Sequence, residues 1–230
     1  MKLVSNSVLV LLMSTIFAQG AYANLISNGS FEDVEGLDRN WEVFQELDDN
    51  DPNTPNWESL AGTGIEIQTS GTVVEAQDGN NYIELDSDPR RGGLDGAGTN
   101  SMMGQTVEVD TAGEYALNFF YQGRTNRSGD DNMIYASIWE HTGGDTFDSL
   151  VEGIQVNALR RDGSWENYGF TADLTEGLYQ VRFQAEGREN TLGGFIDNVR
   201  LTNTAPLNTS ASALLLFAVP AMALRRLRRK

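Results

Sequence analysis

The chain has 230 residues, of which 33 are Asp or Glu and 16 are Lys or Arg, giving a formal net charge of −17. A field of this sign repels a phosphate backbone and argues strongly against nucleic-acid binding. Cysteine is absent, which excludes thiol catalysis and cysteine-based zinc sites.

Residues 1–23 follow the three-part pattern of a secretory signal peptide. Lys2 supplies the positive start, an apolar stretch follows, and Ala21-Tyr22-Ala23 matches the small-x-small cleavage pattern. Cleavage there makes Asn24 the first residue of the mature protein. The alternative is an uncleaved anchor helix, which the short apolar run, interrupted by serine and threonine, disfavours. We therefore predict that the protein is exported.

Short alternating segments separated by Gly, Asn and Asp fill residues 24–204. No amphipathic helix longer than two turns is visible. This spacing predicts an all-β domain, a single antiparallel β-sandwich of the jelly-roll type. The expected strands are Ile65–Gln68, Asn81–Asp86, Gln105–Val109, Tyr115–Tyr121, Met133–Trp139, Tyr168–Ala172, Tyr179–Ala185 and Phe195–Leu201.

The predicted domain is strongly acidic. With both chain ends set aside, ten arginines and all 33 acids remain, which gives a formal charge of 10 − 33 = −23.

Three regions break the alternation and are expected to be loops. Gln45–Asn56 is acidic and contains two prolines, Arg90–Asn100 is rich in glycine, and Thr142–Gly153 has a weaker loop signal. Loops at the ends of a sandwich often carry function.

Residues 205–230 form a second apolar segment with a basic end. Ala211 to Leu224 are mostly apolar, and five of the last six residues are cationic. A spanning helix needs about 20 residues, so this expected apolar helix is short, and its cations would stay on the cytoplasmic side. A buried C-terminal helix is the alternative, but the stretch has no polar face.

This layout resembles the PEP-CTERM sorting signal of Gram-negative bacteria. The Pro-Glu-Pro tripeptide of that family is absent, and Ala205-Pro206 stands in its place. The resemblance implies processing by an exosortase, a membrane protease. It also implies a protein of the cell envelope or extracellular space that the tail anchors transiently in the membrane.

The folded part resembles the galactose-binding-like jelly rolls, which include many carbohydrate-binding modules. The opening motif is Asn24–Glu32, the closing motif is Gly193–Leu201, and Asp78–Ser87 matches a third signature. The nearest branch is an uncharacterised group that includes plant cell-wall proteins. The resemblance implies a jelly roll, often with a structural calcium ion and in several branches with sugar binding, and it does not imply an enzyme.

Catalysis finds little support in the residues themselves. His141 is the only histidine, and it stands beside a Gly-Gly-Asp turn that predicts a surface position. Among 33 acidic residues, some two will always resemble the carboxylate pair of a glycosidase. Such a pair in the sequence is therefore almost no evidence for catalysis. We therefore expect no enzyme.

A calcium site is expected at Glu32 and Asp197. Asp197 is in phase with Phe195, Val199 and Leu201, which points its side chain toward the core. A buried lone carboxylate needs a partner or a metal, and the resemblance places the first and last strands close together. The alternative is that Asp197 accepts backbone hydrogen bonds at the strand end.

Five residues are candidates for binding a sugar. Tyr121 ends a long strand, Arg124 opens the loop beyond it, and Trp57 flanks the acidic loop. Glu66 and Glu84 lie on polar strand faces. Each has a plainer alternative: the aromatic rings pack in the core, the acids face water, and Arg124 pairs with Asp130 or Asp131.

Two functions remain at this stage. The first is an exported, non-catalytic module that recognises a polysaccharide of the extracellular matrix or envelope. The second is a structural surface protein, stabilised by calcium, without specific sugar binding. An exposed aromatic ring beside convergent polar groups would separate the first from the second.

Overall fold

The structure is a computed structural model that describes residues 23–47, 57–124, 132–144, 146–158 and 164–204. The predicted signal peptide up to residue 22, the sorting tail from residue 205 and most of the acidic loop lie outside these residues. Among the residues described, no helix has the length and apolar character needed to cross a membrane.

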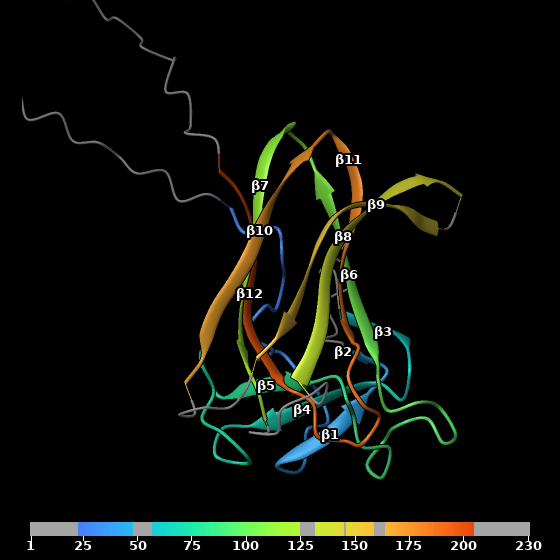
Figure 1. Ribbon diagram of the computed structural model, residues 1–230, viewed down its shortest axis with the longest axis vertical. Coiled ribbons are helices and arrows are strands. Elements are labelled where there is room, and N and C mark those ends of the chain that lie inside the picture. The colour runs from blue at the N-terminus through green and yellow to red at the C-terminus, as the bar shows by residue number, and fades with distance from the viewer. Residues whose placement is uncertain (1–22, 48–56, 125–131, 145, 159–163, 205–230) are drawn as a thin grey trace, which may run out of the picture.

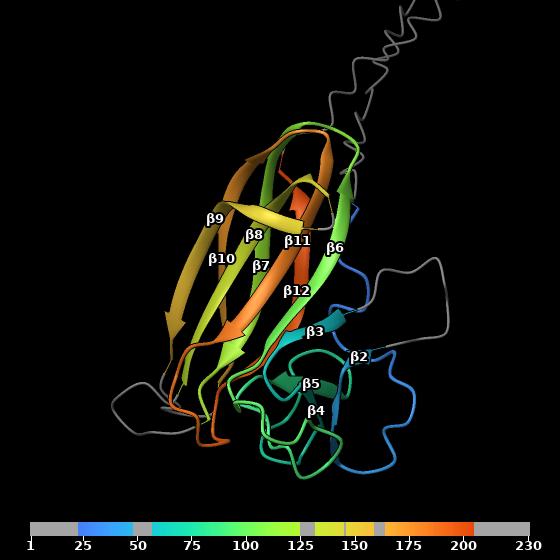
Figure 2. The same cartoon turned by 90° about the vertical axis from the view of Figure 1, so that its right-hand side faces the viewer.

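The described chain forms a β-sandwich of two six-stranded sheets in which every neighbouring pair is antiparallel (Figures 1 and 2). The predicted fold class is therefore confirmed. The first sheet has the order β1 (Trp41–Phe44), β4 (Ile65–Thr69), β5 (Asn81–Glu84), β12 (Phe195–Asn203), β7 (Gly113–Gln122) and β10 (Glu166–Leu174). The second has the order β2 (Glu46–Leu47), β3 (Trp57–Ala61), β6 (Met102–Val109), β11 (Gly177–Ala185), β8 (Met133–Gly143) and β9 (Thr146–Asn157).

Alternation along the strands fills the space between the sheets. On β7, Tyr115, Leu117, Phe119 and Tyr121 all point into the core. The facing sheet contributes alternate residues of β6, β8 and β11 to the same cluster. The long strands run along the length of the sandwich, while β1, β4 and β5 cross at one end of it (Figure 1).

The expected loop at Thr142–Gly153 is instead the tip of a hairpin between β8 and β9. The β9 strand is at the edge of its sheet and pairs only with β8. Its side chains are exposed or half-buried up to Gln155, so no apolar alternation marks it in the sequence. Hydrogen bonding to β8 makes the strand, and the loop prediction is wrong.

The outer face of the first sheet carries a small second core beneath the loop of residues 70–80. Val74 from the loop packs with Tyr82 and Phe195, whose rings lie 5.0 Å apart. The Tyr82 hydroxyl accepts from the amides of Val73 and Val74 and donates to Gln68. A loop fastened in this way buries polar residues that an open sheet would expose to water.

A β-bulge in β12 changes which face its side chains occupy. The pairing with β7 shifts between Asp197 and Arg200, and Asn198 has a φ of 51°. Phe195 therefore packs in the outer cluster, while Val199 and Leu201 point into the main core. The prediction that Asp197 shares the core phase of Val199 and Leu201 is wrong, because period 2 fails across a bulge.

Candidate functional site

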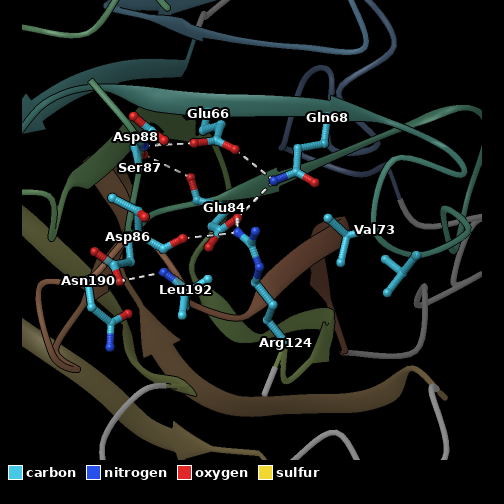
Figure 3. A network of polar contacts seen from close by, with 12 residues as sticks. Glu66, Gln68, Val73, Glu84, Asp86, Ser87, Asp88, Arg124, Asn190 and Leu192 are labelled. Carbon is cyan, nitrogen blue, oxygen red and sulfur yellow. Dashed lines mark hydrogen bonds and ion pairs between the residues drawn. The ribbon is translucent and has the colours of Figure 1, made fainter. Parts of the chain in front are cut away.

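Two glutamates face each other on the outer side of β4 and β5. Glu66 and Glu84 are direct cross-strand partners, and both are almost completely buried. Like charges in this position destabilise a sheet. The amide of Gln68 offsets the repulsion, because its Nε2 donates to Glu66 at 2.7 Å and to Glu84 at 2.8 Å. Figure 3 shows this network.

Arg124 comes from the end of β7 and completes the network. Its Nη1 lies 2.5 Å from Oε2 of Glu84 and 3.1 Å from the carbonyl of Thr191. Its backbone amide donates to the side chain of Asn132. The arginine pairs with a buried acid, which is neither of the two partners expected in its own loop.

Burial determines how these acids titrate. It raises the pKa of Glu84 well above its ordinary value, and the neighbouring Glu66 raises it further, while Arg124 opposes both. Burial also raises the pKa of Glu66. Hydrogen bonds from the backbone amide of Asp88 and from the Gln68 side chain lower that pKa, but by less. Burial therefore opposes the ionisation of both carboxyl groups, whereas the positive charge of Arg124 favours it.

A pocket of about 220 Å³ opens beside this network. Trp41 on β1 stands at its edge, directly across the strand pair from Gln68. The indole is half-buried, and the guanidinium of Arg91 covers one of its faces at 4.1 Å from the ring centre. The lining is Trp41, Glu66, Gln68, Thr72, Val73, Asp88, Arg90, Arg124, Thr191 and Leu192.

An acid and a base from the following loop close one side of the pocket. Asp88 is buried, and its backbone amide donates to Glu66. The side chain of Asp88 is ion-paired with Arg90, and hydrogen bonds from that arginine lower the pKa of the acid. The pocket therefore offers hydrogen-bond donors and acceptors on fixed side chains around one aromatic ring.

The structure gathers three of the five predicted ligand residues, Glu66, Glu84 and Arg124. The other two predictions are wrong. Trp57 is completely buried against Phe31 and Phe183, and Tyr121 is completely buried in the core. A ring without exposed surface cannot stack on a sugar. Both rings pack in the core, which was the alternative to sugar binding.

Tyr121 nevertheless helps to place the site. Its hydroxyl donates to the carbonyl of Asn132, and the side chain of Asn132 accepts the amide of Arg124. A side chain at Gly194 would lie 2.1 Å from this hydroxyl, so only glycine fits there. Tyr121 thus fixes the chain on both sides of the segment 125–131, which lies outside the described residues.

The two predicted calcium ligands fasten the 70–80 loop. Oδ2 of Asp197 accepts from the amides of Gln77 and Asp78, and its Oδ1 accepts from that of Asn198. Glu32 accepts from the amides of Asn80 and Asn81 through one oxygen. Burial raises the pKa of Asp197 to about 6, although the hydrogen bonds from the backbone amides act to lower it.

These contacts account for the burial of Asp197 without a metal. Across the residues that the structure describes, no three acids or histidines gather into a metal-binding group. The hydrogen bonds give Glu32 and Asp197 a structural role, and calcium binding by this pair stays a prediction.

Sequence reasoning missed Gln68, Trp41, Asp88 and Arg90. Polar residues on a strand give no sign that a loop will cover them. The flanking position of Trp41 beside the acidic loop was the one usable signal, and Trp57 shares it. Only the pairing of β1 with β4 places the Trp41 ring beside Gln68.

No family model matches the sequence, and no curated protein matches it. Several solved structures are similar in fold. The module "Family 16 Carbohydrate Binding Module-2" has a TM-score of 0.48 and 13% identity over 78% of this chain and 100% of that one. A carbohydrate-binding module from Cellvibrio mixtus lichenase 5A, solved with cellotriose, has a TM-score of 0.40 and 13% identity over 64% and 91%.

The enzymatically active domain of tailspike protein 4 from bacteriophage CBA120 has a TM-score of 0.45 and 17% identity. The match covers 78% of this chain, but the chain spans only 21% of the tailspike domain. Carbohydrate-binding modules with a β-sandwich fold are thus among the similar structures. The likeness is too distant to carry a function.

Proposed function

We propose that this protein is an exported, non-catalytic module that binds a polysaccharide in the pocket beside Trp41. One observation carries the proposal: a half-buried indole stands beside Arg124, Glu66 and Asp88, which supply donors and acceptors of fixed geometry. A sugar ring presents an apolar face and several hydroxyl groups, and this combination of groups suits it. A partly exposed aromatic ring beside convergent polar groups is the feature expected of a binding module.

The size and charge of the pocket narrow the ligand. About 220 Å³ is below the 300–1,000 Å³ typical of sites for drug-sized molecules, so the pocket fits about one sugar residue of a chain. A domain with a formal charge of −23 repels acidic polysaccharides at low salt. We therefore infer that the ligand is a neutral sugar chain.

A binding role agrees better than catalysis with the bonding of the two glutamates. Glu84 has no exposed surface and is tied to Gln68 and Arg124. Glu66 lines the pocket, but each of its oxygens accepts a hydrogen bond from the protein. A general acid must reach the bond that is broken, and a nucleophile must reach the sugar carbon.

Binding at one such site should be weak, with a dissociation constant on the order of 10 µM to 1 mM, or roughly 4–7 kcal/mol. Many copies on one surface would raise the effective affinity. The proposed setting supplies such copies: export through the signal peptide, sorting through the PEP-CTERM-like tail by an exosortase, and display at the cell envelope or in the matrix.

The test is a glycan-array screen of the purified protein, followed by titration of the best neutral glycan against Trp41→Ala. Trp139→Ala is the matched control, because Trp139 is also half-buried and also carries an arginine, Arg182, at 4.7 Å from its ring. Loss of binding in Trp41→Ala alone supports the pocket. Loss in Trp139→Ala alone would move the site to the other sheet. No binding to any glycan would favour the structural matrix protein.

A further inference from the structure

Two loops meet directly behind the pocket. Residues 85–101 connect β5 to β6, and residues 186–194 connect β11 to β12. An isolated antiparallel bridge pairs Asp86 with Asn100. The side chains of two residues paired in this way lie on the same side, with Cβ atoms about 4.5–5.5 Å apart. The carboxylate of Asp86 and the amide of Asn100 are therefore neighbours.

Oxygen atoms without hydrogen bonds face this place. Oδ1 of Asp86 and Oδ1 of Asn100 are buried, and neither accepts a hydrogen bond from the residues that the structure describes. Asp86 itself is only 2% exposed. An unsatisfied buried polar atom costs about 1–3 kcal/mol, and here each of two residues paired by the bridge carries one such acceptor.

The orientation of these groups is fixed by their other atoms. Oδ2 of Asp86 accepts from the amides of Asn190 and Leu192, at 3.1 and 2.9 Å (Figure 3). Nδ2 of Asn100 donates to the carbonyl of Gly187 at 2.7 Å. Turning the Asn100 amide would bring a donor to Asp86 but would break this bond. The two free oxygens are thus held where they are by hydrogen bonds to the opposite loop.

We propose that Asp86 and Asn100 bind a divalent cation of the calcium type. A cation satisfies several oxygens at once, and carboxylate and amide oxygens are ligands that calcium accepts in flexible geometry, with backbone carbonyls or water completing six to eight. Glu189 brings a second negative charge to the 85–101 loop, since its Oε1 lies 2.8 Å from where a Cβ on Gly98 would be. This site uses different residues from the Glu32 and Asp197 pair.

The cation would stabilise the wall of the pocket. Asp86 holds the amides on both sides of Thr191, a β-branched residue with the uncommon φ of 62°. Thr191 and Leu192 line the pocket, and the Thr191 carbonyl accepts from Arg124. If the proposed sugar binding is correct, removal of the cation should weaken it, although the cation does not touch the sugar.

The test is calorimetric titration of the chelator-stripped full-length protein with calcium chloride, without any sugar, so that it stands independently of the proposed function. Asp86→Asn is the informative variant. Its amide oxygen can still accept from Asn190 and Leu192, while its NH₂ group can donate to Asn100, so the fold needs no cation. Asp173→Asn, on an exposed position of β10, is the matched control.

We expect Asp86→Asn to bind one calcium ion fewer than the wild type and the control to bind the same number. A second variant, Asn100→Asp, should bind calcium at least tenfold more tightly, because it adds a charged ligand. Equal stoichiometry in the wild type and Asp86→Asn, or no uptake by the wild type, would overturn the proposal and leave a buried water molecule as the partner of these oxygens.

Discussion

The buried pair of Arg124 and Glu84 makes the sharpest stability prediction. Glu84 has no exposed surface, and burial and Glu66 raise its pKa while Arg124 opposes that rise. If the ion pair holds the Glu84 carboxylate charged at pH 7, replacing Arg124 with Ala removes the balancing positive charge, and Glu84 must then fold in the protonated form. Protonation at pH 7 of an acid whose ordinary pKa is 4.5 costs about 1.36 × 2.5, or about 3.4 kcal/mol. This agrees with the 3–5 kcal/mol typical of breaking a buried ion pair from one side.

The same reasoning fixes the sign of the pH dependence. A folded-state pKa above the unfolded value makes folding less favourable as pH rises, so the penalty should shrink as the pH falls. At pH 5.5 it should be only about 1.4 kcal/mol, which is 1.36 kcal/mol for each unit above 4.5. Urea denaturation at both pH values, followed by tryptophan fluorescence, measures the difference between the variant and the wild type.

Two further variants control this experiment. Arg124→Met combined with Glu84→Gln should recover most of the loss, because position 84 then carries no unpaired charge. Arg90→Ala should cost less than about 1 kcal/mol, because the Arg90 side chain is 78% exposed. A loss below 1 kcal/mol in Arg124→Ala at pH 7, or one that does not change with pH, would mean that Glu84 is already neutral in the native domain.

Four other results are expected. Tyr121→Ala should cost about 3–5 kcal/mol in urea denaturation, whereas a cost below 1 kcal/mol would contradict its place in the core. With a pKa of about 6, Asp197 should make the domain more stable as pH falls from 7 to 5, and Asp197→Asn should flatten that slope; an unchanged slope would assign it to other acids. If Glu32 and Asp197 bind calcium as predicted, Glu32→Gln should reduce the rise in melting temperature that calcium produces; an equal rise in the variant and the wild type would exclude the pair. Protein recovered from outside the cell should begin at Asn24, and deletion of residues 206–230 should change its location but not its melting temperature; an intact N-terminus or a large loss of stability would contradict these two predictions.

The sequence predicted those strands well that bury one face in the main core. Strands β6, β7, β8, β11 and β12 all contain residues that alternate between that core and the other face. The edge strand β9 has almost no buried residues, and β1, β2 and β3 have only four, two and five residues, which is why these strands were not predicted. Their pairing partners, and not their own composition, determine them.

The site was only partly predictable for a different reason. Glu66 and Glu84 were interpreted as polar positions that could face water, but Gln68, Asp88 and Arg124 hold them in a buried network. Asp197 was assigned to the wrong face because its bulge leaves no sign in the spacing of apolar residues. In each case the deciding contact joins segments far apart in the chain, so a local pattern does not contain it.

The direction of β12 determines how the protein would present its pocket on a surface. Phe195 begins this strand beside Glu84, and Asn203 ends it beside Tyr115 (Figure 1). Nine residues of strand span roughly 26 Å at about 3.3 Å per residue, neglecting the first. Asn24 pairs with Thr202, near the end of β12, so both ends of the domain lie at the end of the sandwich opposite the pocket. A tether at either end would therefore hold the binding face outward, away from the supporting layer and free to meet a neighbouring cell or fibre.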